Sequence, residues 1–335
     1  MVKKLYWKIK NYLESLYISR KQTKEETTGC LSHKEDKRDL VFGGFWDQGT
    51  KYEYCTLRND FWRYDQYPFN LCVFASAVQG ASFQEGKRFS VRFAVQLAKR
   101  DGMTTRDGFS YLRAGRKIAQ KYGRLPYELM PDETKGHTWA SYSKYEITDE
   151  MLDIAAKYKT PAYKRVYTQG SAIELLQTGH VLFTANQWYS AMNRPRPEDY
   201  YMVRAGRYIG GHAWCVDGYR SNNAHTLKDF EVTQSFGRSY GQNGVARLKD
   251  LFAKGHFAVY MEEKILGRTD RERASEIYQN KFIKGSTPTI YRVIDGKKLP
   301  YANMEAFVRD AGKEDNFYEV SDYTIEQLEL GNLIT

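Results

Sequence analysis

Residues 65–77 have the sequence DQYPFNLCVFASA, in which Gln66 precedes Cys72 by six positions and the cysteine opens an apolar run of helical length. A free cysteine has a pKa of about 8.5, and a helix N-terminus together with a nearby imidazolium lowers it by several units. We therefore expect Cys72 to lie in the first turn of a helix and to be a thiolate at neutral pH.

A histidine that can serve as its base lies in residues 210–219, GGHAWCVDGY. His212 is the one of the six histidines that follows two glycines in a strand-like stretch. A thiolate that attacks a carbonyl creates an oxyanion, which needs fixed donors, and the protonated base then releases the leaving amine. The pattern predicts Cys72 as nucleophile, His212 as base, and Gln66 with the Cys72 backbone N–H as oxyanion donors.

A third segment follows in residues 231–244, where EVTQSFG is succeeded by YGQNG. In order and spacing, the three segments resemble the papain-like cysteine peptidases, in which the histidine follows the cysteine by about 130–150 residues. Here the separation is 140 residues. Asp107-Gly108 resembles the family's glycine-bearing segment that pairs with extended substrate, and the resemblance covers roughly residues 40–265.

The resemblance implies an α+β, two-lobed papain-like fold with a helical left lobe and a β-barrel-like right lobe. It implies that Gln234 orients the ring of His212 beneath Phe236, and that Gly108 and Phe236 contact substrate. Gln234 stands where the family has asparagine, and its extra methylene would shift the amide by about 1.5 Å. Gly80 interrupts the apolar run at a cost of about 1 kcal/mol relative to alanine, so we expect a bend or an end of the helix there.

The cysteine content and the lack of long apolar runs argue against several classes of protein. The four cysteines form no regular framework, which argues against a disulfide-built secreted protein, and we expect Cys215 to be a core residue. Met1–Lys4 is basic, but charged residues break the stretch that follows, so no signal peptide and no membrane-spanning run is expected. We expect a cytoplasmic or particle-associated protein, from a phage or a bacterium.

The net charge of +10 is unevenly spread: residues 1–39 carry +4, residues 300–335 carry −6, and the middle carries +12. A basic body favours acidic or nucleic-acid-associated protein substrates. We expect no nucleic-acid binding by the chain itself, because no zinc-ligand spacing, phosphate-binding loop or RNA-binding aromatic motif accompanies the charge. No metal and no organic cofactor is expected.

Four parts are predicted along the chain. Residues 1–39 comprise an amphipathic helix over 1–20 and a polar tether, and residues 40–155 form the lobe with the nucleophile. Residues 156–265 form the lobe with His212, built from short strands. In residues 266–335, a connector leads to a hairpin with Asp295-Gly296 at its turn, a short helix and a further strand. This small α+β module weakly resembles accessory domains of bacterial surface and secreted hydrolases.

The sequence thus predicts a thiol peptidase that hydrolyses peptide bonds through an acyl-enzyme on Cys72, with a protein or peptide as substrate. The alternative is a catalytically silent papain-fold structural or binding protein of a bacterial surface or phage particle. Transfer of the acyl group to an amine instead of water stays open. Residues 1–20 are either a short propeptide or a docking segment, and residues 266–335 are either a docking module or a stabilising lid.

Overall fold

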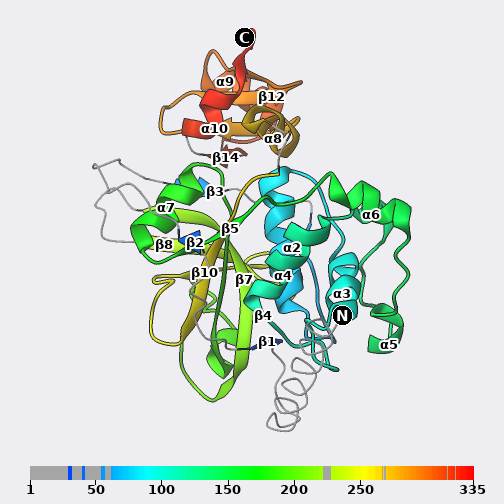
Figure 1. Ribbon diagram of the computed structural model, residues 1–335. Helices are drawn as coiled ribbons and strands as arrows, with labels where there is room; N and C mark the ends of the chain where they lie inside the picture. The colour runs from blue at the N-terminus through cyan, green and yellow to red at the C-terminus, as the bar shows by residue number, and fades with distance from the viewer. Residues whose placement is uncertain are drawn as a thin grey trace.

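The computed structural model describes most of the chain beyond residue 61, together with three short segments before it. The described residues are 29–31, 40–41, 54–56, 62–221, 228–265, 267, 269–314, 316–320 and 322–335. The predicted amphipathic helix over residues 1–20 lies outside them, as does most of the tether. In the described part, helices gather on one side of the molecule and a sheet on the other (Figure 1).

The helical lobe is built around α2 (Cys72–Glu85), every residue of which is buried. Apolar faces of neighbouring helices pack against it around Phe74 and Phe93. The other helices of this lobe are α3 (Val91–Arg100), α4 (Leu112–Tyr122), α5 (Trp139–Tyr142) and α6 (Asp149–Ala156), with a 3-10 turn at Tyr127–Leu129. Helices cover one side of α2 and the sheet covers the other, so α2 lies between the two lobes.

Helix α2 continues through Gly80, so the expected end of the helix at this residue is wrong, whereas the expected bend stays a prediction. A Cβ built on Gly80 would lie 2.5 Å from the ring of Phe183 and 3.0 Å from Val181. Because the helix packs this closely on the sheet, a residue without a side chain is needed at this position despite its low helix propensity.

The second lobe is a sheet that has eight strands among the described residues, in the order β2-β5-β10-β6-β7-β8-β9, with β3 paired to β7; all pairs are antiparallel except β2 with β5. Its core contains Trp188, Trp214 and Phe230. The strands are β2 (Leu40–Val41), β3 (Tyr54–Thr56), β5 (Tyr163–Val166), β6 (Leu182–Tyr189), β7 (Tyr208–Ser221), β8 (Lys228–Thr233), β9 (Val245–Leu248) and β10 (His256–Glu262). Helix α7 (Gln169–Gln177) and a 3-10 turn (Ser190–Asn193) complete this lobe. Cys215 is buried in this core, as predicted.

The C-terminal part forms a separate mixed sheet, drawn above the two lobes in Figure 1, in the order β14-β11-β12-β13-β15. Asp295 and Gly296, with φ of 48° and 74°, make the expected hairpin turn between β12 and β13. Its elements are α8 (Asp270–Tyr278), β11 (Phe282–Lys284), β12 (Ile290–Ile294), β13 (Lys297–Pro300), α9 (Met304–Ala311), β14 (Tyr318–Glu319), α10 (Asp322–Gln327) and β15 (Glu329–Leu330).

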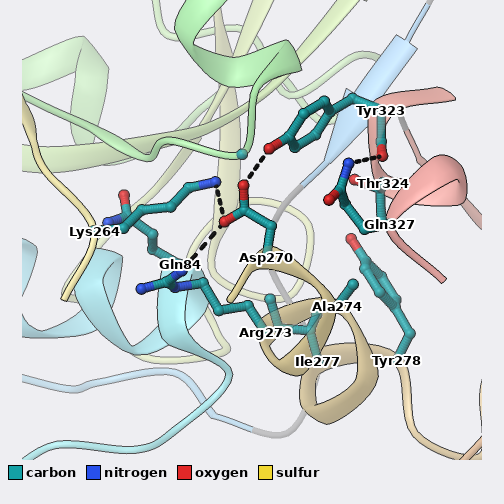
Figure 2. A pocket seen from close by; sticks show the side chains of 11 residues that line it. Gln84, Lys264, Asp270, Arg273, Ala274, Ile277, Tyr278, Tyr323, Thr324 and Gln327 are labelled. Carbon is teal, nitrogen blue, oxygen red and sulfur yellow. Dashed lines mark hydrogen bonds and ion pairs between the residues drawn. The ribbon is translucent and has the colours of Figure 1, made fainter. Parts of the chain in front are cut away.

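Buried ion pairs connect this C-terminal module to the two lobes. The Nε of Arg273 on α8 donates to Glu85 at the end of α2 at 2.8 Å, and both side chains are buried. Beside this pair, Asp270 receives Lys264 at 2.7 Å and Arg273 at 3.2 Å, and it also contacts the hydroxyl of Tyr323 (Figure 2). These groups border a small cavity of about 30 Å³. Their charges are paired with one another, so the cavity belongs to a structural junction.

One short pairing connects the N-terminal segment to the helical lobe. Strand β1 (Cys30–Leu31) lies parallel to β4 (Ser110–Tyr111), which directly precedes α4. Among the described residues, no helix is long and apolar enough to cross a membrane.

Candidate active site

Cys72 is the first residue of α2 and is completely buried. Burial raises the pKa of the Cys72 thiol to about 12, although backbone N–H groups of Ala213 and Gly29 act in the opposite direction. The predicted thiolate is therefore wrong for this structure. Cys72 does lie at a helix N-terminus, as predicted. The helix dipole favours the thiolate, but removal of water from the thiol raises its pKa by more than the dipole lowers it.

His212 lies on β7, directly before the residue whose amide reaches the Cys72 thiol. Its Nε2 is 2.9 Å from the Oε1 of Gln234, at the end of β8. Because a carbonyl oxygen can only accept, Nε2 carries the proton in this arrangement and Nδ1 is the unprotonated nitrogen. Nδ1 is buried and has no hydrogen-bond partner among the described residues. This is the state in which the ring can accept a proton from a thiol.

Aromatic side chains enclose the ring of His212. Phe236 stacks on it with a centroid separation of 4.6 Å and an interplanar angle of 7°, and Trp188 meets it edge-on at 4.6 Å. Burial lowers the pKa of His212 to about 3, with Gln234 acting in the opposite direction. In the closed structure the thiol and the imidazole are thus both neutral.

Gln66 is nearly fully buried and is held from two sides by Ser235. Its backbone N–H donates to the Ser235 carbonyl at 2.9 Å, and its Oε1 accepts from the Ser235 hydroxyl at 2.6 Å. Since Oε1 is engaged, the amide nitrogen is the end of the side chain that remains for an incoming oxygen. Ser235 was given no role by sequence reasoning, although it lies between Gln234 and Phe236 in the quoted segment.

Gly108 is buried, with a φ of 89°, and a Cβ there would lie 3.1 Å from Trp139. It precedes β4 by two residues, so extended pairing begins at Ser110 instead. Phe236 is partly buried and packs on His212. A role for Gly108 and Phe236 in contacting substrate stays a prediction.

The chain's own strand β1 lies against both halves of the site. The Gly29 carbonyl accepts from Ser110 N at 2.9 Å, and a Cβ on Gly29 would be 2.3 Å from the carbonyl oxygen of Asn70. On the other side, a Cβ on Gly211 would be 2.2 Å from the carbonyl oxygen of Cys30. An extended segment is thus placed between the residues that precede Cys72 and those that precede His212. A Gly-Cys-Leu break in an otherwise polar stretch was the only signal for it.

The structure also contains a buried charge cluster that the sequence did not indicate. Arg116 on α4 lies 3.5 Å from Glu262 on β10, and Arg124 pairs with the same carboxylate. The three side chains are almost completely buried. Within the part of the chain that the structure describes, no group of three or more His, Cys, Asp or Glu side chains is arranged to bind a metal ion.

Comparison with solved structures identifies several cysteine proteases of similar fold. Xylellain, a cysteine protease from Xylella fastidiosa, superposes with a TM-score of 0.61 at 19% identity, covering 73% of this chain and 98% of its own. Procathepsin B from Trypanosoma congolense gives 0.58 at 14% identity, covering 72% and 87%. The bromelain protease from Ananas comosus, solved in complex with an inhibitor, gives 0.50 at 13% identity, covering 64% and 100%.

No protein-family model matches the sequence, and no curated protein matches it. At these identities the structural likeness establishes the fold and leaves activity to be inferred from the site. The chain has an α+β papain-like fold, similar to that of papain-like cysteine proteases over about 70% of its length, with an additional C-terminal mixed sheet.

Proposed function

We propose that this chain is a thiol peptidase whose described structure is a closed, latent form. The observation that carries the proposal is the pairing of His212 Nε2 with Gln234 Oε1 at 2.9 Å, which leaves Nδ1 unprotonated next to the segment that contacts the Cys72 thiol. The fold shared with xylellain, a cysteine protease, supports the assignment of Cys72 and His212 as nucleophile and base.

The chemistry starts when β1 leaves and an extended peptide takes its place. Entry of water removes the burial that raises the Cys72 pKa and lowers the His212 pKa, so both values move toward an ion pair. The thiol proton passes to Nδ1, and the sulfur attacks the carbonyl carbon. The amide nitrogen of Gln66 and the Cys72 backbone N–H hold the resulting oxyanion.

The C–N bond then breaks, and His212 gives its proton to the departing amine. The acyl group remains on Cys72 until water, activated by the neutral imidazole, hydrolyses the thioester. An amine that takes the place of this water would yield transfer instead of hydrolysis. Among the residues in these steps, Gln234 and Ser235 are positioning residues, because they act through His212 and Gln66.

The experiment treats the full chain and a Gly29→Val variant with an epoxide thiol inhibitor and maps the modified residue by mass spectrometry. Both proteins are also incubated with a peptide library. We expect modification at Cys72, faster in Gly29→Val because a side chain cannot fit against Asn70, and cleavage that is lost in Cys72→Ser. Absence of labelling and of cleavage in Gly29→Val would overturn the proposal.

A catalytically silent binding protein is the second candidate. The neutral state of the closed dyad and the presence of β1 next to it favour this alternative. It predicts labelling of Cys72 in Gly29→Val without cleavage of any peptide.

A further inference from the structure

The side chain of Cys30 lies in a buried site next to the candidate nucleophile. Cys30 is 3% exposed and belongs to the same packed cluster as Cys72. The remaining buried members, here called the Cys30 site, come from α2, α4 and the sheet: Val73, Leu112, Ala185, Ala213, Ala258 and Tyr260. A short side chain of β1 therefore fills a buried site directly beside Cys72.

Donor groups converge on the Cys30 site. Burial and the nearby Cys72 raise the pKa of the Cys30 thiol, whereas the Arg116 guanidinium and a backbone hydrogen bond with Leu112 act in the opposite direction. Leu112 is the first residue of α4, an 11-residue helix whose N-terminal amides favour a negative charge. Both effects would stabilise an anion at this position more strongly than a thiol.

Arg116 is directed back along its own helix toward the Cys30 site. Its Nη1 donates to the carbonyl oxygen of Leu112, one turn earlier, at 2.6 Å, and the guanidinium lies 4.0 Å from the ring centre of Phe183. The side chain is 0% exposed. Nevertheless its Nη2 has no hydrogen-bond partner among the described residues.

The local charges do not balance. Glu262 is shared by Arg116 and Arg124, and Arg124 also donates to Thr160 at 2.6 Å. Among the residues that the structure describes, two guanidinium groups thus face one carboxylate, which leaves one buried positive charge in excess. Buried charges are ordinarily paired, because an unpaired charge loses its hydration without compensation. Burial accordingly lowers the pKa of Arg116 to about 10.

We propose that the Cys30 site is a specificity site for an acidic side chain of an extended peptide substrate, with Arg116 Nη2 and the Leu112 backbone N–H as its donors. The inference rests on the proposed peptidase function. A carboxylate would supply the missing negative charge beside Arg116. Aspartate requires the least rearrangement, because it adds only two non-hydrogen atoms to the side chain of cysteine. The net charge of +12 on residues 40–299 favours approach of acidic peptides.

The test uses β1 itself as the ligand, in the full chain. Cys30→Asp and Cys30→Asn remove the thiol and have the same shape, so they differ in charge alone. The rate at which iodoacetamide modifies Cys72, located by peptide mapping, reports how often β1 leaves. We expect modification of Cys30→Asp to be about tenfold slower than that of Cys30→Asn, as for a buried charge-assisted hydrogen bond.

The same pair of substitutions is then made in an Arg116→Gln background, where Glu262 still has Arg124 as its partner. Without the guanidinium, Cys30→Asp should be modified at least as fast as Cys30→Asn. Equal rates for the two variants in the wild-type background, or the same ratio in both backgrounds, would show that Arg116 is a structural residue only.

A second matched pair of variants tests the proposal without a substitution at Arg116, in case Arg116→Gln does not fold. Cys30→Lys and Cys30→Met have side chains of similar length, and we expect faster modification of Cys72 in Cys30→Lys because its charge meets Arg116. Slower or equal modification would overturn the proposal.

Peptide cleavage is measured separately in the Gly29→Val variant, where substrates with aspartate in the place of Cys30 should be cleaved faster than those with asparagine. Loss of all cleavage would contradict the peptidase function, whereas the labelling ratios would still decide the charge preference of the Cys30 site.

Discussion

The Nε2 of His212 lies 2.9 Å from the Oε1 of Gln234, so a glutamine supplies the contact that orients the candidate base. Strand β7 carries His212 and β8 directly precedes Gln234; the two strands pair from Cys215–Thr233, with a register shift between Val216 and Gly218. The longer side chain of glutamine thus reaches the ring of His212 in this fold.

This contact predicts the behaviour of three variants at one position. Gln234→Ala should lower kcat by about 10–100-fold, the usual effect of removing a partner that orients a histidine ring. Gln234→Asn should also lose activity, because a side chain shorter by one carbon no longer reaches Nε2. Gln234→Glu keeps an acceptor and adds a negative charge that raises the pKa of the imidazole, so the alkaline limb of its pH profile, where the imidazolium loses its proton, should move to higher pH. Wild-type kcat in Gln234→Asn would show that this contact is dispensable.

A second prediction concerns the Cys72 thiol in the closed and opened states. In the full chain, where its pKa is about 12, alkylation should be slow at pH 7 and should still rise above pH 10. In Gly29→Val the inflection should fall below the free-thiol value of about 8.5, because water and the imidazolium then reach the sulfur. Gly170→Ala is the control, since a Cβ at Gly170 meets no atom within 4 Å. Identical profiles for Gly29→Val and the wild type would exclude β1 as the cause.

Gln66 and Ser235 should differ in their effects on turnover. Loss of one oxyanion donor costs about 100–1,000-fold in kcat, so Gln66→Ala should be reduced on that scale with little change in KM. Ser235→Ala keeps the Gln66 amide as donor but removes the hydroxyl that holds Gln66 Oε1, so we expect a smaller decrease in kcat. If Ser235→Ala proved as damaging as Gln66→Ala, the hydroxyl would have a direct part in the reaction.

Acid should weaken the closed fold. The pKa values of His212, about 3, and His180, about 4, lie below the ordinary 6.5, so the unfolded chain takes up protons first as the pH falls from 6.5. Their stabilising contribution is present above pH 6.5 and is lost progressively toward pH 4. Asp132 has the opposite sign, because its raised pKa of about 6 favours proton uptake by the folded form.

Asp101, Glu133 and Asp270, whose pKa values are lowered by their partners, act with the two histidines, whereas Glu174 and Asp229, whose pKa values are raised by burial, act with Asp132. Because five groups oppose three, the thermal midpoint should decrease between pH 6.5 and pH 4. His180→Gln should flatten this decrease, and Asp132→Asn should make it steeper. A midpoint that rises on acidification would contradict the assignment of His212 and His180 as buried neutral groups.

The C-terminal module should contribute to the stability of the body. Arg273→Met leaves Glu85 buried without its guanidinium, a change that costs about 3–5 kcal/mol. Arg271 forms a matched but exposed pair with Glu329, so Arg271→Met should cost no more than about 1 kcal/mol. Denaturant unfolding of the two variants measures the difference. Equal stabilities would mean that the buried pair of Arg273 and Glu85 contributes no more to stability than the exposed pair of Arg271 and Glu329.

Much of the fold follows from local sequence. The start of α2 at Cys72, the strand that carries His212 and the Asp295-Gly296 hairpin follow from apolar patterns and turn residues. The boundaries of the four predicted parts stay predictions. Gly80 was misjudged because helix propensity ignores Phe183, a partner more than 100 residues away in the chain.

The properties that escaped prediction depend on tertiary contacts. The direction of the Cys72 pKa shift depends on burial beneath β1, and no local pattern shows that Gly29–Leu31 lies there. The ion pairs of Glu262 join residues that are 138 and 146 positions apart in the chain, and charged residues at such separations form no recognisable motif.

In the proposed latent form, β1 is a tethered ligand, because it belongs to the same chain as Cys72. The effective concentration of a ligand within the same chain does not change when the protein is diluted. A free peptide must therefore compete with a ligand that is always present at that level, whatever the amount of enzyme. A single cut in the chain between Leu31 and Leu40 would turn the same contacts into a bimolecular complex, which dilution separates.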